Sequence, residues 1–381
     1  MTGVIHVITS LERGGAQRVA LEIAARLHDP GRPQLLVTGR PGALDDEARA
    51  RLGTRLLHLP QLVGPIDPLK DLAAAAALVR LIDRQVDRLG SPVVVHTHSS
   101  KAGVIGRLAA RAVRGVIVVH TVHGFGLDTA PHHAWALEAA ERLAAVAGDV
   151  TVFVSDADRH RAEVLALHIR RSVTIRAGVD PAPFMALRRA RGAGARAVTV
   201  GNLKAQKDPL FHVEILAAWR RLDRRARLVI LGDGPLRDQV MQRARALGVD
   251  DALELPGFVD DVRPYLAAAN VCLLASAWEG LPCSVLEATA AGLPCVVKGG
   301  WAADIGWAKS VRALEVAATA DDFAAALMAT CAKPPRVPKL RRDFTRAGML
   351  AALDELYHEL IGPPRPTGPM FARRRPSHRS R

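Results

Sequence analysis

Two glutamates, Glu279 and Glu287, stand eight positions apart, with a Gly-Leu-Pro turn directly after the first. The run Asn270–Ser276 before them predicts a short buried strand, and Ser284–Ala291 after them predicts the start of a helix. Glu279 is therefore expected at the carboxyl end of a strand, in the crevice where open α/β sheets bind ligands. Backbone N–H groups of residues 280–284, at a helix N-terminus, favour anionic groups. Carboxylates beside an anion-binding turn suit a ligand with both hydroxyl and phosphate groups, such as a sugar nucleotide.

A turn rich in lysine follows a second predicted strand, Arg196–Gly201, and carries Asn202, Lys204 and Lys207. An ammonium group in such a turn can neutralise the negative charge of a departing diphosphate. The alternative is a solvated basic loop without a ligand. We favour the phosphate site.

The N-terminal half contains turns of the same kind. Gly14 and Gly15 follow the predicted strand Val4–Thr9 and open a helix, where glycines permit a close backbone approach to a phosphate. An ordinary strand-to-helix turn is the alternative. The string from His96 to Gly103 stands at another such junction, and either Ser99 or Ser100 is a candidate helix cap.

A pair of histidines ends the predicted strand Val116–Val122. By strand alternation His120 and Val122 face one way, whereas Thr121 and His123 face the other. His123 stands at the carboxyl end of the strand, before a glycine, and is expected to point into the ligand crevice. The alternative is a hydrogen-bonded rim residue, and we favour His123 over His120 for function.

The elements that must position these residues alternate along the whole chain. Strand-like runs separated by alanine-rich helical runs predict parallel sheets that are covered on both faces. One series of runs spans residues 4–155 and a second begins at Arg196, with a Gly- and Arg-rich stretch between them. The expected organisation is an N-terminal domain 1–178, a linker 179–195, a C-terminal domain 196–344, a helix 345–362 and a basic tail 363–381.

Composition excludes several classes of protein. The chain has 381 residues, 49% of them hydrophobic and 24% charged, which suits a globular protein of two domains. No apolar run is long enough to span a membrane, and the four cysteines have neither zinc-site nor disulfide-framework spacing. The net charge is +14, and six arginines lie in the last 17 residues. This tail is either a solvated extension or a segment attracted to anionic lipid; it has no aromatic pattern for binding nucleic acid.

These motifs together resemble the retaining glycosyltransferases of family 4, of the polysaccharide-assembly type. The resemblance runs from about Val4 to Leu360, and the Glu279–Glu287 motif is its most specific part. It implies the GT-B fold, an α/β architecture in which two Rossmann-like parallel-sheet domains face each other across a cleft. The C-terminal helix is expected to cross back to the first domain.

The resemblance also implies roles for single residues. The catalytic residues would be His123, Lys207 and Glu279. The donor would be bound by Gly15, Asn202, Lys204, Gly232, Phe258, Gly280, Leu281 and Glu287. The acceptor would contact His98, Ser99 and Lys101, with Lys101 near an acceptor phosphate. No metal and no cofactor are expected, because lysines and backbone amides take over the role of a cation.

The chain departs from the family pattern at two places. Asn202 replaces the usual arginine, so Lys204 is expected to supply that charge, and Asp304 is the nearest carboxylate to the glycine pair at 299–300. The pair Asp156 and Asp158 looks like a metal-binding motif, but a helix N-terminus with acids in its first turn is the simpler interpretation.

The expected activity is transfer of a sugar from a nucleotide-diphosphate donor to a glycan or lipid-linked acceptor in cell-envelope or exopolysaccharide synthesis. The expected location is the cytoplasm, either without membrane contact or, if the basic tail binds lipid, on an anionic membrane surface. A sugar-nucleotide epimerase of related fold and a non-catalytic sugar-nucleotide-binding homologue are the alternatives.

Overall fold

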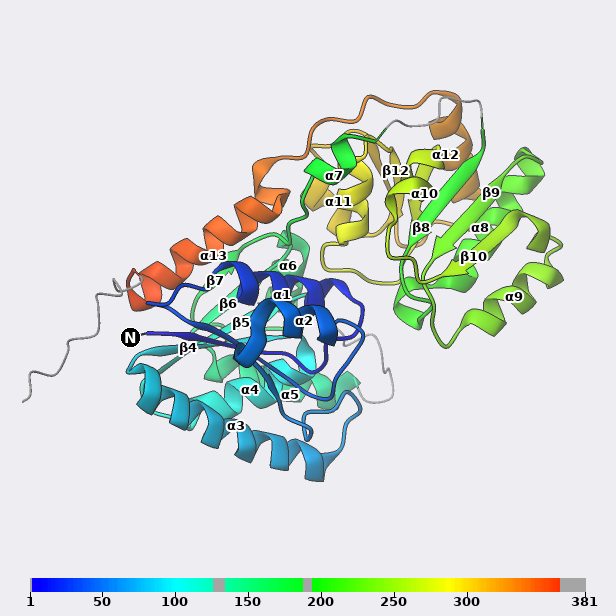
Figure 1. Ribbon diagram of the computed structural model, residues 1–381. Helices are drawn as coiled ribbons and strands as arrows, with labels where there is room; N and C mark the ends of the chain where they lie inside the picture. Colours follow the sequence, from blue (N-terminus) through cyan, green and yellow to red (C-terminus); the bar gives the residue numbers. More distant parts are fainter. Residues whose placement is uncertain (1, 126–133, 188–193, 364–381) are drawn as a thin grey trace, which may run out of the picture.

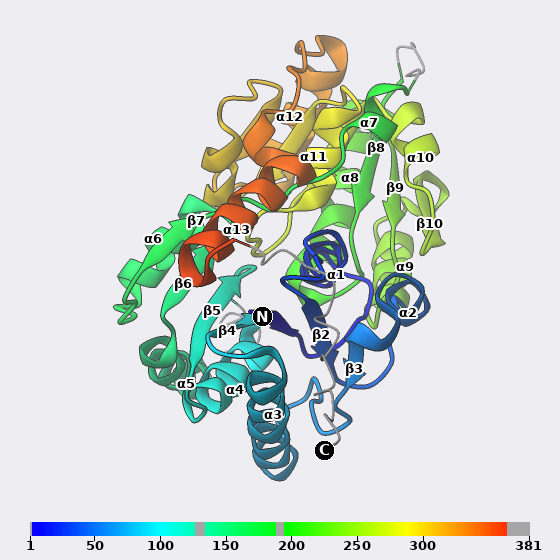
Figure 2. The ribbon, with the colours of Figure 1, turned by 60° about the vertical axis from the view of Figure 1, so that its left-hand side comes forward.

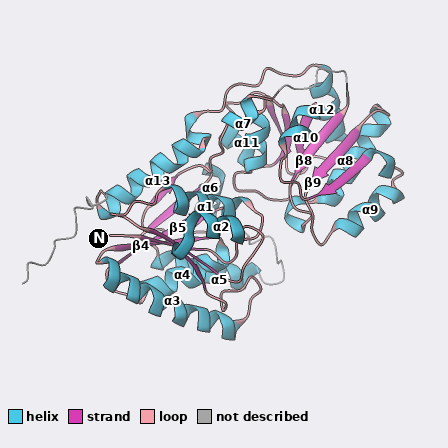
Figure 3. Cartoon of the chain, in the orientation of Figure 1, coloured by secondary structure: helices cyan, strands magenta, loops and turns pink. Residues whose placement is uncertain are grey.

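The computed structural model describes residues 2–125, 134–187 and 194–363 (Figure 1). These residues form two parallel sheets, each with helices on both faces (Figure 3). The chain therefore has the predicted α/β class and the predicted pair of Rossmann-like domains. Figures 1 and 2 show the two domains side by side, with the sheets in different orientations.

The N-terminal sheet has seven strands in the order β3-β2-β1-β4-β5-β6-β7. Its strands are β1 (Val4–Val7), β2 (Gln34–Thr38), β3 (Leu56–His58), β4 (Val93–His98), β5 (Val116–Val122), β6 (Val150–Phe153) and β7 (Ser172–Thr174). Its helices are α1 (Gly15–Arg26), α2 (Asp45–Leu52), α3 (Pro68–Leu89), α4 (Ser100–Arg111), α5 (Ala134–Ala147) and α6 (Asp156–Val164). Central strands such as β1 and β4 are buried along their whole length, as expected for a sheet covered on both faces.

The C-terminal sheet has six strands in the order β10-β9-β8-β11-β12-β13. Its strands are β8 (Arg196–Val200), β9 (Arg227–Leu231), β10 (Leu253–Gly257), β11 (Val271–Leu274), β12 (Cys295–Lys298) and β13 (Val311–Leu314). Its helices are α7 (Ala182–Met185), α8 (Pro209–Leu222), α9 (Arg237–Ala246), α10 (Arg263–Ala268), α11 (Cys283–Ala290) and α12 (Ala320–Ala332). In both sheets the first strand pairs with the fourth, β1 with β4 and β8 with β11, and this reversal of strand order creates a crevice at the carboxyl ends.

The last helix, α13 (Arg346–Ile361), follows the C-terminal domain but lies against the N-terminal one (Figure 2). Tyr357 on this helix is fully buried and hydrogen-bonded to His96 of β4 at 2.6 Å. Arg32 and Asp354 form an ion pair beside it. The prediction that the C-terminal helix crosses back to the first domain is confirmed.

All four cysteines are free thiols. Among the helices that the structure describes, none combines the length and apolarity needed to cross a bilayer. The basic tail lies outside the described residues, apart from its first position.

Candidate active site

A cavity of about 580 Å³ lies between the two domains, at the carboxyl edges of both sheets. The turn before α1 and the end of β5 line it from the N-terminal domain. The turns after β8, β9, β10 and β11 and the start of α11 line it from the other side. Every residue with a predicted catalytic or donor-binding role borders this cavity: Gly15, His123, Asn202, Lys204, Lys207, Gly232, Phe258, Glu279, Gly280, Leu281 and Glu287.

The centre of the C-terminal wall is an ion pair between Lys207 and Glu279. The Glu279 side chain is only 6% exposed, and its charge is balanced by the lysine, whose side chain is 20% exposed. Gly201 makes this arrangement possible, because a Cβ there would lie 3.2 Å from Cδ and Cε of Lys207. An ammonium group has three N–H donors, so Lys207 can bond to Glu279 and to a ligand phosphate at the same time.

Glu287 lies about one turn into α11, as predicted, and faces the same cavity. Burial raises the pKa of Glu287 to about 7, and the positive charge of Arg18 opposes this shift. The carboxyl group is therefore close to its titration point at neutral pH. In its ionised form it accepts hydrogen bonds only, which suits neighbouring hydroxyl groups of a ligand.

The N-terminus of α11 supplies backbone donors to the cavity. Pro282 is the N-cap residue, and no side chain caps the first turn. Leu281, Cys283 and Ser284 line the cavity at this point. The free N–H groups of a first helical turn attract anions, so this wall combines donors, a lysine and two carboxylates.

A tight contact between two glycines joins the walls of the cavity. A Cβ on Gly280 would lie 2.8 Å from the carbonyl carbon and oxygen of His123, and one on Gly124 would lie 3.1 Å from the Gly280 nitrogen. Gly124 also has a φ of 106°, which a residue with a side chain rarely adopts. The loop after β11 therefore touches the end of β5, and His123 is brought next to the Glu279 loop from the opposite domain.

Strand alternation separates the two histidines at the end of β5. His120 is buried, hydrogen-bonded to Thr97 at 2.9 Å and packed against Gly103, whereas His123 borders the cavity. Burial lowers the pKa of His123 to about 4, so the ring is neutral at physiological pH. Its Nε2 atom lies 3.3 Å from Nδ1 of His98. A neutral imidazole offers one donor and one acceptor to its surroundings.

Two protein-family models match most of the chain. Residues 13–183 match the model of Glycosyltransferase Family 4, and residues 194–332 match the model of Glycosyl transferases group 1. The chain belongs to glycosyltransferase family 4. The predicted enzyme class, a glycosyltransferase, is thereby confirmed.

Individual relatives agree with this assignment. The glycosyltransferase is similar to the UDP-Gal:alpha-D-GlcNAc-diphosphoundecaprenol alpha-1,3-galactosyltransferase of Escherichia coli, with 29% identity over 314 residues that cover 77% of this chain and 78% of the relative. Its fold is similar to sucrose-phosphate synthase from Thermosynechococcus elongatus, with a TM-score of 0.76, 16% identity, and coverage of 94% of this chain and 99% of the other. It is also similar to Anabaena HepE in complex with UDP and glucose, with a TM-score of 0.68, 16% identity, and coverage of 93% and 94%. These structural likenesses show the GT-B fold.

His98, Ser99 and Lys101 are the three residues predicted to contact an acceptor. None of them borders the cavity of the glycosyltransferase. His98 is fully buried, and Ser99 lies at the start of α4 with a φ of 64°. Nζ of Lys101 forms an ion pair with Asp71 at 2.7 Å and donates to a backbone carbonyl. Asp71 on α3 thus shares the charge of Lys101, and the contact of these three residues with an acceptor stays a prediction.

Asp304 takes a structural position. Its side chain is 1% exposed, and its carboxylate accepts hydrogen bonds from the backbone N–H groups of Asp156, at 2.8 Å, and Ala157, at 3.3 Å. Ser155 is the N-cap of α6, so the two acids after it lie in the first helical turn, as the simpler interpretation predicted. The glycosyltransferase thus uses Asp304 to hold the second domain against α6 of the first.

Arg13 is a charged cavity residue that reasoning from the sequence missed. Arg13 borders the cavity, its guanidinium lies 5.3 Å from the ring centre of Phe258, and its carbonyl accepts a hydrogen bond from the Asn202 side chain at 3.2 Å. Arg13 thus brings a cation from the N-terminal domain to the turn where Asn202 replaces an arginine. Its position directly before Gly14 was the available signal.

Proposed function

We propose that this glycosyltransferase transfers a sugar from a nucleotide-diphosphate donor to a glycan or lipid-linked acceptor, with retention of anomeric configuration, in cell-envelope or exopolysaccharide synthesis. The observation that carries the proposal is the wall formed by Lys207, Glu279 and Glu287 at the N-terminus of α11. The donor lies on the C-terminal domain, with Glu287 on ribose hydroxyls and Glu279 near the sugar.

The chemistry follows from the charge that develops on the leaving diphosphate. Lys207, Lys204 and the backbone N–H groups at the start of α11 stabilise that charge, and each such donor lowers the barrier by about 3 kcal/mol. These groups do the work that a metal ion does in other phosphate chemistry. Closure of the two domains excludes water, which otherwise competes with the acceptor.

Retention and the nature of the acceptor are supported by likeness to relatives. The Escherichia coli relative is named for a UDP-linked galactosyl donor, a diphosphoundecaprenol-linked acceptor and an alpha-1,3 product. A lipid-linked acceptor would bring the enzyme to a membrane surface, where the six arginines of residues 365–381 would be attracted to anionic headgroups. Loss of binding to anionic vesicles after deletion of residues 363–381 is the expected result, and unchanged binding would remove this role of the tail.

The decisive experiment is thermal unfolding of the purified chain with UDP, GDP, ADP and TDP in turn. A nucleotide at about 100 times its dissociation constant stabilises the fold by roughly 2.7 kcal/mol, so one nucleotide should raise the melting temperature clearly. Sugars carried on that nucleotide are then tested for transfer, and the anomeric proton coupling of the product reports retention or inversion.

The other outcomes each reject part of the proposal. Conversion of the donor sugar without any acceptor would indicate an epimerase. A folded protein that responds to none of the four nucleotides would favour a non-catalytic role, in keeping with the replacement of the usual arginine by Asn202.

A further inference from the structure

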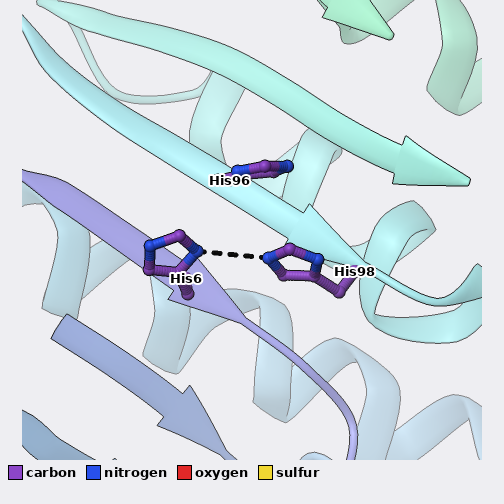
Figure 4. A group of neighbouring side chains, drawn as sticks. All are labelled: His6, His96 and His98. Atoms are coloured by element: carbon purple, nitrogen blue, oxygen red, sulfur yellow. Dashed lines mark hydrogen bonds between the residues drawn. The ribbon is translucent and has the colours of Figure 1, made fainter. Parts of the chain in front are cut away.

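Three buried histidines lie behind the cavity wall, on the two central strands of the N-terminal sheet (Figure 4). His6 comes from β1, and His96 and His98 come from β4. Figure 4 shows His6 and His98 facing each other across a hydrogen bond, which is 3.1 Å long between Nδ1 and Nε2. Nitrogen atoms from the three rings lie within 4.8 Å of one another.

Hydrogen bonding explains this cluster better than a metal ion does. A zinc ion needs nitrogen lone pairs that converge on one point about 2.0–2.1 Å away. The rings of His96 and His98 are instead stacked, with centroids 4.3 Å apart and planes 29° apart. Every ring nitrogen of the three histidines also has a hydrogen-bond partner already: His96 is bonded to Tyr357 and to a threonine, each at 2.6 Å.

His6 and His98 belong to a chain of hydrogen bonds that reaches the cavity. Oε1 of Gln34, on β2, lies 2.9 Å from Nε2 of His6. His6 is bonded to His98 at 3.1 Å, and Nδ1 of His98 lies 3.3 Å from Nε2 of His123. Gln34, His6 and His98 are fully buried, and His123 is the member that borders the cavity. This chain of hydrogen bonds therefore runs from the interior of the sheet to the proposed sugar site.

The direction of these bonds follows from the chemistry of the amide oxygen. Burial lowers the pKa of His6 and His123 to about 4 and that of His98 well below its usual value, so each ring carries a single N–H. Because Oε1 of Gln34 can only accept, His6 donates from Nε2 and must accept at Nδ1. His98 therefore donates from Nε2 to His6 and accepts at Nδ1. The donor to Nδ1 of His98 is then Nε2–H of His123.

We propose that Gln34 is a positioning residue which, through His6 and His98, holds His123 as the Nε2–H tautomer. Nδ1 of His123 is thereby left as a hydrogen-bond acceptor for a hydroxyl group of the bound sugar. This use of the tautomer rests on the proposed function, whereas the tautomer itself does not. Gln34, His6 and His98 lie on three adjacent strands, β2, β1 and β4, and His123 follows β5, the next strand, so the sheet itself aligns these hydrogen bonds.

The tautomer is measured directly by NMR on the full chain labelled with ¹⁵N-histidine. The two ring nitrogens of a neutral histidine have well separated shifts, and the signals of His123 are assigned by their loss in His123→Gln. The expected result is protonation at Nε2 of His123. Protonation at Nδ1, or one equivalent of a metal ion that is lost in His6→Gln, would overturn the proposal.

Variants at Gln34 then test its role. Gln34→Leu removes the acceptor and should give a mixture of His123 tautomers, whereas Gln34→Glu keeps an acceptor and should restore Nε2–H. Thr38→Val is the matched control, because Thr38 is buried on the same strand and its hydroxyl has no hydrogen-bond partner in the described part of the chain. If Gln34→Leu does not fold, a normal tautomer in Gln34→Glu and the wild-type measurement still decide the question. An unchanged tautomer in folded Gln34→Leu would remove Gln34 from this role.

Kinetics separate this inference from the proposed function. With donor and acceptor identified, Gln34→Leu should lower kcat about tenfold, the scale of one hydrogen bond, with KM for the donor changed less and Gln34→Glu close to wild type. An Nε2–H tautomer in a protein that transfers no sugar would reject the function and keep the chain of bonds. Full turnover in a Gln34→Leu variant with mixed tautomers would reject the use of Nδ1 as an acceptor.

Discussion

At the scale of single residues, Lys207 has two negatively charged partners. In the unliganded cavity it balances the buried charge of Glu279, and in the proposed reaction it meets the departing diphosphate. Its neighbour Glu287 carries a proton at acidic pH and loses it near neutrality, because burial opposes its charge. The net charge of the cavity therefore depends on the protonation of a few partly buried side chains, which can be measured.

The first prediction concerns Lys207→Ala. Loss of one preorganised cation should lower kcat by about 10²- to 10³-fold, measured as release of the nucleoside diphosphate. Lys70→Ala is the matched control, because Lys70 also forms an ion pair, with Asp67 at 2.9 Å, but lies away from the cavity. Near-normal turnover in folded Lys207→Ala would reject the phosphate role.

The second prediction concerns Glu287→Gln and pH. The pKa of Glu287 is raised on folding from 4.5 to about 7, so the folded state binds the proton more tightly than the unfolded state does. This contribution to stability is complete below about pH 4.5 and is lost as the pH rises through 7. The variant has no such loss, so the difference in unfolding free energy, variant minus wild type, should rise by about 2–3 kcal/mol between pH 4.5 and pH 8.

Urea unfolding at the two pH values measures this difference. Glu315→Gln, an exchange at an exposed position of the same domain, is the control. A pH-independent difference for Glu287→Gln would show that burial does not hold the proton on this carboxyl group.

At the scale of elements, α13 joins the two domains at a site remote from the cleft. It begins beside the linker, where Val179 forms a bridge with Thr345, and ends against the N-terminal sheet. The hydroxyl of Tyr357 is the polar anchor of this helix, because it satisfies a nitrogen of the buried His96.

The third prediction concerns Tyr357→Phe. The exchange keeps the packing of the ring but leaves Nδ1 of His96 without its partner, which should cost about 1–3 kcal/mol of unfolding free energy. The chain has one other tyrosine, Tyr265, which is half-buried in α10, and Tyr265→Phe is the matched control. Equal effects in the two variants would show that the bond to His96 contributes nothing specific.

At the scale of the whole molecule, the site exists only where the domains meet. The Gly124–Gly280 contact, the bond from Asn202 to Arg13 and the bonds from Asp304 to α6 all cross the domain boundary. The proposed donor site belongs mainly to one domain, whereas His123 comes from the other. Turnover should therefore be more sensitive to domain contact than nucleotide binding is.

The fourth prediction concerns Gly280→Ala. A methyl group at this position would lie 2.8–2.9 Å from backbone atoms of His123 and Gly124, so the two loops must separate. We expect kcat to fall at least tenfold while the Kd for the responding nucleotide changes less, as measured by calorimetry. Gly300→Ala is the matched control, since a Cβ at Gly300 meets no atom within 4 Å. Unchanged kcat in Gly280→Ala would show that this contact is dispensable.

The sequence by itself determined the features that depend on neighbours along the chain. A strand end followed by one helical turn places Glu279 and Glu287 at the same carboxyl edge of the C-terminal sheet. The alternation of strands and helices predicted the two parallel sheets, and the side-chain period of two in a strand separated His123 from His120. The edge strands β3, β7 and β13 were not predicted, because their partly exposed sequences lack the continuous apolar run of a buried strand.

The tertiary structure alone decided which charged side chains are paired, which are buried, and which side chains form hydrogen bonds with one another. Asp71 compensates Lys101 from a different helix, and Asp304 turns away from the cavity to hold α6. The alignment of Gln34 with His6 and His98 arises because β2, β1 and β4 are neighbours in the sheet, although they are far apart in sequence. Such relationships depend on distances between remote segments, and local patterns in the chain do not encode those distances.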